Sequence, residues 1–412
     1  MLDSETDRAI NASSWVFCNF HGKRESNGSH LTLTREQRIK LPKRSGPIHP
    51  KESMMEAKNE APNVRAMYPR LLQFGVSYGD MERMSRKTTD WPSFTSLMQN
   101  LAEKWEEAGD AALNSGRLQT PREHWRHATD YYHYAQLRTP ESLLKEKLRS
   151  ASRRCYSKLA TVLDRPPVRC DIPFQSTLLP GYLRVAYPGA PCVILIGGLD
   201  SSKEVELHYF AEIFLNRSCS VFYFDGPGQG ELLGQVPIAG GFEKSVANAI
   251  SFLTADARVR PASIGCFGVS FGGHLACRAA ASDPRISACI SIGGFFDSRI
   301  LERLPPIASA AVRKACGVSE QGDMSEIAHQ ITLEPLRGQM KCPLLIVHGT
   351  EDHLVDMAQI DAMKDWASGP VETMVLDGSE HVCSDRFHEC LPFMGDWMAD
   401  LLMQQNKSSV AM

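Results

Sequence analysis

The stretch that most constrains the fold of this chain is residues 263–276, where a short apolar run leads into Gly-x-Ser-x-Gly and then into an alanine-rich run. This pattern predicts a strand, a sharp turn and a helix, with Ser270 at the tip of the turn. Gly268 and Gly272 have no Cβ atom, so the strand and the helix can approach closely while Ser270 takes a strained backbone conformation. We therefore expect Ser270 to be a nucleophile.

Apolar runs on both sides of this stretch predict the sheet that holds it. Residues 168–186 are expected to form a strand pair around Pro180-Gly181. Six further strands are expected at Cys192–Ile196, Ser220–Phe224, Ile264–Phe267, Ala288–Ile292, Leu344–Val347 and Thr373–Leu376. Because these runs are fully apolar and alternate with helix-length spans, they predict an α/β fold with a mainly parallel sheet and helices on both faces. A closing helix is expected at about 386–403.

The rest of the chain divides into three regions by composition and periodicity. Residues 1–64 are polar and aperiodic, which predicts a poorly ordered tail. Residues 65–167 are expected to be a helical cap module, because apolar residues recur at helical spacing. The helices expected in it are 93–112, 120–134 and 139–163. Residues 168–404 are expected to be the α/β domain, with a helical lid insertion at about 297–340, a span too long for one covering helix.

Composition excludes several classes of function. The chain has 412 residues, a formal net charge of −3 and no basic run, so we expect no nucleic-acid partner. An apolar stretch of about 18 residues is missing, and the N-terminus is polar, so neither a membrane span nor a secretory signal is expected. The 12 cysteines are scattered without a Cys-x-x-Cys pair, which indicates reduced thiols and a cytoplasmic protein. Residues with metal-ligand spacing are also missing, and we expect no metal or cofactor.

Ser270, Asp352 and His381 each directly follow a predicted strand, and their side chains are of the types that form a catalytic triad. The carboxyl ends of parallel strands meet at one edge of the sheet, where such sites gather. A serine hydroxyl needs a neutral imidazole to accept its proton, and a carboxylate must hold that imidazole in the right tautomer. The order Ser, Asp, His is a known order of such triads. His353 and Asp356 lie close enough to Asp352 to be its rivals.

Charge that develops on an attacked carbonyl oxygen needs fixed hydrogen-bond donors. One expected donor is the backbone N–H of Phe271, which directly follows the nucleophile. The other is the N–H of Leu199, in the glycine-rich loop after the first core strand. Leu199 and Phe271 are therefore the predicted oxyanion hole.

Three other polar residues are interpreted as structural. Asp225 lies in a glycine-rich turn that could be a phosphate loop, but Gly-Lys-Ser/Thr does not follow, so a role in shaping the backbone is favoured. His348 precedes a glycine at a strand end, and His274 lies one turn into the helix after Ser270. We expect both histidines to serve packing.

Four stretches carry a resemblance to a known family: Asp90-Trp91-Pro92, residues 197–204, residues 224–231 and residues 291–295. With these and the Gly-x-Ser-x-Gly turn, the chain resembles the α/β-hydrolase superfamily. More narrowly, it is similar to the 2,6-dihydroxypseudooxynicotine hydrolase family and related fungal polyketide-processing hydrolases. The resemblance covers about residues 65–404.

The resemblance implies a serine hydrolase that can cleave a carbon–carbon bond next to a ketone. Ser270, Asp352 and His381 match the family's triad, and Leu199 with Phe271 match its oxyanion hole. Family members can use a further acid to protonate the leaving carbon, for which Glu204 and Glu302 are candidates. The resemblance also suggests a homodimer.

We hypothesise a serine hydrolase that cleaves a carbon–carbon bond of a ketone or β-dicarbonyl, or an ester bond, in a small secondary metabolite during its biosynthesis. An alternative is an acyl or polyketide transferase, or a chain-releasing thioesterase, with the same triad and a different acceptor. A third hypothesis is a non-catalytic protein of this fold that binds a partner through its helical module.

Overall fold

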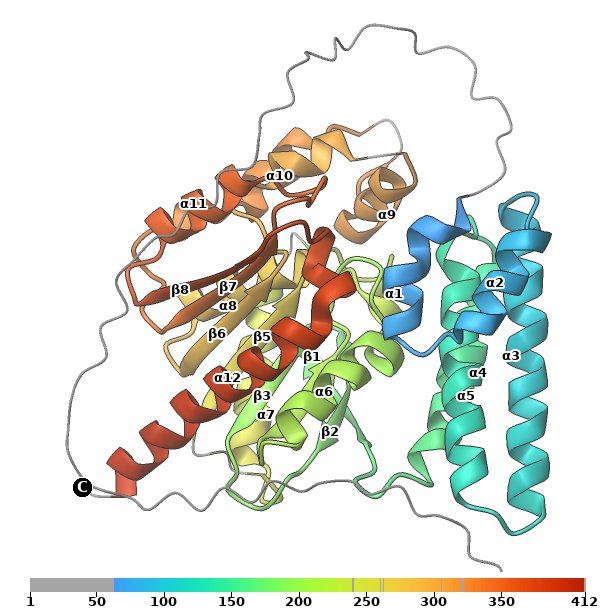
Figure 1. Cartoon of the computed structure of the whole chain (residues 1–412). Coiled ribbons are helices and arrows are strands. Elements are labelled where there is room, and N and C mark those ends of the chain that lie inside the picture. The colour runs from blue at the N-terminus through green and yellow to red at the C-terminus, as the bar shows by residue number, and fades with distance from the viewer. Residues whose placement is uncertain are drawn as a thin grey trace, which may run out of the picture. The chain divides into compact units, whose positions relative to one another are not determined.

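A single sheet of eight strands carries the fold of the residues that the computed structural model describes, which are 63–238, 241–259, 261, 263–304, 306–319 and 322–410 (Figure 1). The strands are β1 Val168–Phe174, β2 Thr177–Arg184, β3 Cys192–Ile196, β4 Ser220–Phe224, β5 Ile264–Val269, β6 Ile286–Ile292, β7 Leu344–Gly349 and β8 Val371–Leu376. Their spatial order is β1-β2-β4-β3-β5-β6-β7-β8. Neighbours from β4 to β8 pair in parallel, while β2 pairs antiparallel with both β1 and β4. The predicted mainly parallel sheet is confirmed.

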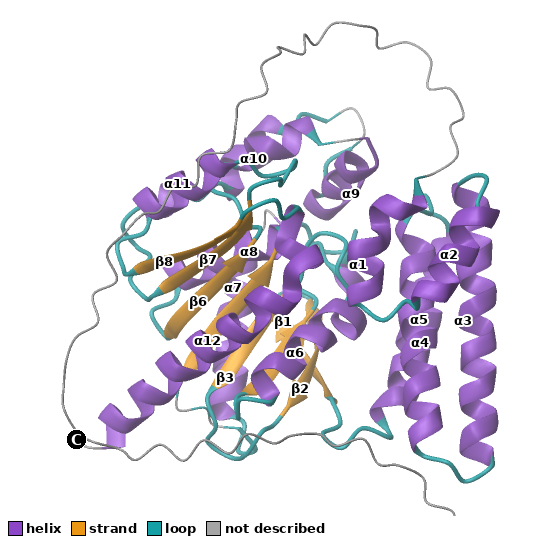
Figure 2. Cartoon of the chain, viewed as in Figure 1, coloured by secondary structure: helices purple, strands orange, loops and turns teal. Residues whose placement is uncertain are grey.

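Helices cover both faces of the sheet, as Figure 2 shows. They are η2 Lys203–Leu207, α6 His208–Leu215, η3 Gly230–Leu232, α7 Phe242–Ala255, α8 Phe271–Ser282, α11 Met357–Trp366, η7 His381–Arg386 and α12 Phe387–Val410. Along β3, Val193 and Leu195 join the core beneath α6 and α12, whereas Ile194 and Ile196 join the core beneath α7, α8 and α11. Successive side chains of a strand point to opposite faces, so a strand covered on both faces is apolar throughout.

The first antiparallel turn differs from our expectation. Pro180 and Gly181 lie inside β2, where they pair with Asp171 and Cys170 of β1, and the turn comes earlier, at Gln175, whose φ is +50°. Gly181 is used for packing instead, because a Cβ atom there would lie 2.6 Å from Cζ of Phe222. The prediction that Pro180-Gly181 forms the turn of this strand pair is therefore wrong.

The insertion at about 297–340, which we expect to be a lid, contains short helices between β6 and β7. They are η5 Ser298–Arg303, α9 Pro306–Cys316, α10 Ser325–Ile331 and η6 Glu334–Leu336. Because β6 and β7 are parallel neighbours, this insertion starts at the carboxyl end of β6, the edge at which strand β5 delivers Ser270.

The helical region before the sheet contains η1 Val64–Met67, α1 Tyr68–Gln73, α2 Tyr78–Lys87, α3 Trp91–Asn114, α4 Gln119–Leu137 and α5 Leu143–Ala160. Asp90 and Ser93 form a capping box at the start of α3, where Pro92 suits the first turn. Buried residues of this region, such as Phe94 and Tyr156, share one apolar core with the α6 and α12 face of the sheet. Residues 1–62 of the expected tail lie outside the described residues.

Helices α3 and α4 pack closely at Gly109. A Cβ atom on Gly109 would lie 2.5 Å from both Cδ1 and Nε1 of Trp125, whose indole N–H donates to Asp110 at 2.9 Å. Trp125 is buried, so its ring cannot move away without opening the core.

We predict that Gly109→Val lowers the free energy of unfolding by about 2–3 kcal/mol, because the added side chain forces the two helices apart. Ala111→Val is the matched control, since Ala111 is exposed on the same helix and should cost only about 0.5 kcal/mol. Equilibrium denaturation in urea measures both values. Equal losses for the two variants would contradict the packing argument.

Candidate active site

Ser270 stands on a strained turn between β5 and α8. Its φ of +56° and ψ of −124° place a non-glycine residue where L-residues are rare. A Cβ atom on Gly268 would collide with the carbonyl of Gly272, and one on Gly272 would collide with the carbonyls of Ile196 and Gly197. Both glycines are therefore required for α8 to start this close to the ends of β3 and β5.

The three residues predicted for a triad lie in one hydrogen-bonded chain. Oγ of Ser270 is 2.8 Å from Nε2 of His381, and Nδ1 of His381 is 2.7 Å from Oδ2 of Asp352. Ser270 follows β5, Asp352 follows β7 and His381 follows β8, so the carboxyl ends of three strands supply the chain. With Nδ1–H donating to the carboxylate, Nε2 is free to accept the proton of the serine hydroxyl.

Asp352 is buried and held as a carboxylate. Its Oδ1 accepts the backbone N–H groups of Leu354 and Val355, each at 2.9 Å. Burial alone would raise the pKa of Asp352, but hydrogen bonding and charge from His381, with the two amides, lower it below its ordinary value. The group therefore stays ionised and can orient the imidazole through the neutral pH range.

The rivals of Asp352 lie apart from His381. Asp356 caps helix α11 by accepting the N–H of Gln359, and His353 is exposed. His348 is buried, and its Nε2 lies 2.9 Å from the carbonyl of Val355, so it braces the loop that carries Asp352.

His274 is enclosed by aromatic rings and backbone. Its ring stacks on Phe295 with 4.4 Å between centroids, and its two nitrogens contact the carbonyls of Phe295 and Ile331. These contacts tie α8 to Phe295, just before the lid, and to α10 within it. His274 therefore serves packing and does not line the cavity beside Ser270.

Leu199 and Phe271, predicted to form the oxyanion hole, line the same cavity as Ser270. Within the described residues, neither backbone N–H donates a hydrogen bond to another group. Phe271 is the first residue of α8, where helix amides lack partners inside the helix. Both amides are therefore available to an oxygen bound beside Ser270.

The loop that carries Leu199 is fixed by the glycine-rich turn after β4. Nε2 of Gln229 donates to the carbonyl of Gly197 at 2.6 Å, and Oε1 of Gln229 accepts the N–H of Gly226 at 3.2 Å. Ser201 adds a bond from inside the loop, because its Oγ accepts the N–H of Gly198 at 3.0 Å. Gln229 is buried, so it joins the two loops without competition from water.

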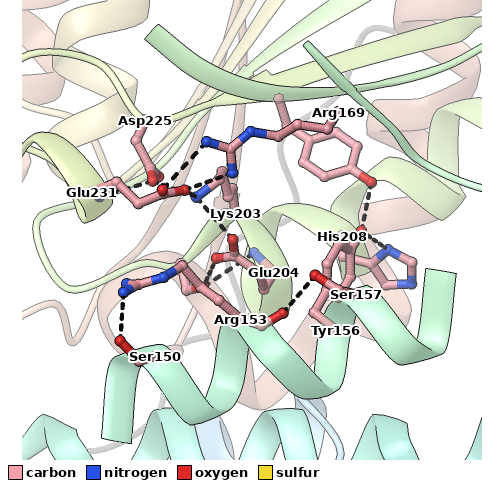
Figure 3. A network of polar contacts seen from close by, with 12 residues as sticks. Ser150, Arg153, Tyr156, Ser157, Arg169, Lys203, Glu204, His208, Asp225 and Glu231 are labelled. Carbon is pink, nitrogen blue, oxygen red and sulfur yellow. Dashed lines mark hydrogen bonds and ion pairs between the residues drawn. The ribbon is translucent and has the colours of Figure 1, made fainter. Parts of the chain in front are cut away.

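A buried lysine, Lys203 at the start of η2, also contacts the glycine-rich turn after β4. Nζ of Lys203 lies 2.6 Å from both Asp225 and Glu231 and 2.8 Å from Glu204 (Figure 3). Asp225 also accepts the N–H of Glu231 at 3.0 Å, which is the backbone-shaping contact expected of it. Burial alone would lower the pKa of Lys203, but the three carboxylates raise it, so the ammonium stays charged.

Neither candidate for a further acid faces Ser270. Glu204 belongs to the Lys203 network, and Glu302 is exposed on η5. The described residues that line the cavity beside Ser270 include neither of them.

The cavity beside Ser270 has a volume of about 380 Å³, which is within the usual range for small-molecule sites. Its walls come from α1, the end of α4, the loop after β3, the lid and the segment around His381. Most of the lining is apolar, and the charged residues among it are Arg70, Arg138, Asp200, Glu206 and Glu380. The lid and the helical region thus shape the space in which a substrate would lie.

The described part of the chain holds no group of three His, Cys, Asp or Glu residues placed to bind a metal ion. None of its helices is both long enough and apolar enough to cross a membrane.

Sequence reasoning missed Gln229, Lys203 and the charged residues of the cavity. The sequence shows that Gln229 lies in the same glycine-rich turn as Asp225, but not that this turn contacts the Leu199 loop. Arg70 and Arg138 carried no signal, since helical surfaces commonly carry arginine.

The chain is similar in sequence and in fold to known proteins over the range that contains this site. The sequence profile of the prolyl oligopeptidase family matches residues 243–402, a range that contains Ser270, Asp352 and His381. A 2,6-dihydropseudooxynicotine hydrolase of Paenarthrobacter nicotinovorans is 29% identical over 347 residues, covering 83% of this chain and 94% of that protein. A crystal structure of 2,6-dihydroxy-pseudo-oxynicotine hydrolase aligns with a TM-score of 0.74 and 28% identity, covering 81% of this chain and 95% of that one.

A 20-hydroxy-prefusarin hydrolase of Gibberella moniliformis is 32% identical over 237 residues. The match covers 54% of this chain and 54% of that protein, so the chain matches about half the length of this fungal relative.

We predict that Gln229→Leu lowers kcat on an activated ester by about 10- to 100-fold, because the Leu199 loop shifts when its bridge is lost. The unpaired buried groups should also lower the free energy of unfolding by about 1–3 kcal/mol. Gln235→Leu is the matched control, since Gln235 is exposed in the same turn and should change kcat by about twofold at most. A Gln229→Leu enzyme with undiminished kcat would show that the bridge does not position the loop.

Proposed function

We propose that this chain, a hydrolase of the α/β-hydrolase superfamily, cleaves a carbon–carbon bond next to a ketone, or an ester bond, in a small secondary metabolite. The observation that carries the proposal is the hydrogen-bonded chain from Ser270 through His381 to Asp352, which opens into the cavity of about 380 Å³. Similarity along 94% of a 2,6-dihydropseudooxynicotine hydrolase supports the choice of bond, and similarity to fungal hydrolases supports the substrate class.

In the proposed mechanism, Oγ of Ser270 attacks the substrate carbonyl while Nε2 of His381 takes the hydroxyl proton. The backbone N–H groups of Leu199 and Phe271 stabilise the oxyanion. When the bond beyond the carbonyl breaks, His381 returns the proton to the leaving carbon or oxygen, and the acyl group stays on Ser270.

The second half of the reaction uses the same groups with water. Water loses a proton to His381 and attacks the acyl carbon, and the proton then returns to Ser270 as the acid product leaves. Asp352 remains ionised throughout and stabilises the imidazolium that forms in each half.

We predict that Ser270→Ala and His381→Ala each abolish measurable turnover of an activated ester, and that Asp352→Asn lowers kcat by about 10⁴-fold because it favours the wrong tautomer. A fluorophosphonate probe should label the native chain at Ser270 and leave Ser270→Ala unlabelled. Ser282→Ala, at the exposed end of the same helix, is the control and should label fully. Labelling of the Ser270→Ala chain, or turnover by both alanine variants, would overturn the proposal.

Acyl transfer by the same triad is the alternative, since it differs only in the acceptor. We predict that turnover in ¹⁸O-labelled water places one label in the carboxylic acid product, because water releases the acyl group. An ester or amide product without the label would favour transfer to an alcohol or amine.

A further inference from the structure

Arg138 is the one charged group of the Ser270 cavity that is both partly buried and without a partner of opposite charge in the described chain. It follows the last residue of α4. Its Nε atom is buried and makes no hydrogen bond to a described residue. Its guanidinium lies over the ring of Trp91, with Cζ 5.1 Å from the ring centroid, which holds the group in place but satisfies none of its donors.

The neighbouring arginine shows the contrast. Arg70 lines the same cavity, but it lies 2.8 Å from Glu206 and donates to the carbonyl of Asp200 at 3.4 Å. Glu206 is further bound by His133 at 3.1 Å and by Tyr134 at 3.2 Å. The Arg70–Glu206 pair is therefore internally compensated and offers little charge to a ligand.

The other carboxylates of the cavity, Asp200 and Glu380, form no ion pair with Arg138 in the described chain. Both are exposed to solvent. Burial is the largest influence on the pKa of Arg138 and lowers it, Asp200 raises it, and the charge of Arg70 lowers it. A guanidinium remains protonated even so, and thus a half-buried cation faces the cavity with free donors.

We propose that Arg138 binds a carboxylate of the substrate, so that this hydrolase acts on ketones or esters that carry a carboxylate remote from the bond to be cleaved. A guanidinium presents planar paired donors that match a carboxylate, and exclusion of water strengthens such a pair. This inference rests on the proposed function, because it takes Ser270 as the position of the scissile carbonyl. Trp91 beneath the guanidinium sets its plane, and the carboxylate completes its hydrogen bonds.

The experiment uses two series of p-nitrophenyl esters made from dicarboxylic acids of four to eight carbons. In one series the far end is a free carboxylate, and in the other it is a methyl ester of the same length. We expect the native chain to show at least tenfold higher kcat/KM for the free acid at the best length. We expect Arg138→Gln to remove that preference mainly by raising KM for the acid series.

Arg117→Gln is the matched control, because Arg117 is exposed in the loop between α3 and α4 and does not line the cavity. It should keep the native preference. Arg138→Lys should show an intermediate preference, since it keeps the charge and loses the paired donors. If Arg138→Gln fails to fold, competition on the native chain decides the question: monomethyl adipate should inhibit turnover at least tenfold better than dimethyl adipate.

A native chain without preference for the acid series, or an Arg138→Gln variant that keeps the preference, would overturn the carboxylate site. Failure of the proposed function is distinguishable from these results, because it would appear as turnover of both series by Ser270→Ala.

Discussion

The close approach of α8 to the ends of β3 and β5 is the constraint on which the rest of the site depends. It exists because Gly268 and Gly272 present no Cβ atom to the carbonyls that they face. The approach forces Ser270 into a strained backbone conformation with positive φ and leaves the N–H of Phe271 without a helical partner. One backbone contact therefore sets both the position of the hydroxyl and the direction of a donor for the oxyanion.

The other residues of the active site differ in how deeply they are buried. Asp352 is buried and bound by two amides, while His381 is more exposed and can reach both the carboxylate and Ser270. On the opposite side, Gln229 and Lys203 tie the Leu199 loop to the turn after β4. The buried polar groups thus hold loops in place, and the cavity itself stays largely apolar.

The strands were predicted correctly where both faces of the strand are buried, because the sequence there is a short apolar run. The β3 and β4 strands match their predicted bounds, because each is a short, mainly apolar run that is buried at every position and follows a turn. The strand pair expected at 168–186 is present as β1 and β2, but its turn is wrong: Pro180-Gly181 suggests a turn by local propensity, whereas Gly181 lies in β2 and packs against Phe222 of β4. A contact made across some forty residues of chain overrides the local preference.

The sequence by itself determined the strand order along the chain, the sharp turn at Ser270 and the three residues that follow strand ends, because periodicity, glycine spacing and order are local properties. Tertiary structure alone decided which charges are compensated. Arg70 and Arg138 look alike in the sequence, yet only Arg70 meets a buried carboxylate, Glu206, which a different part of the chain supplies. Pairing and desolvation depend on what folding brings near, and for that reason the chemical preference of the cavity could be inferred only from the structure.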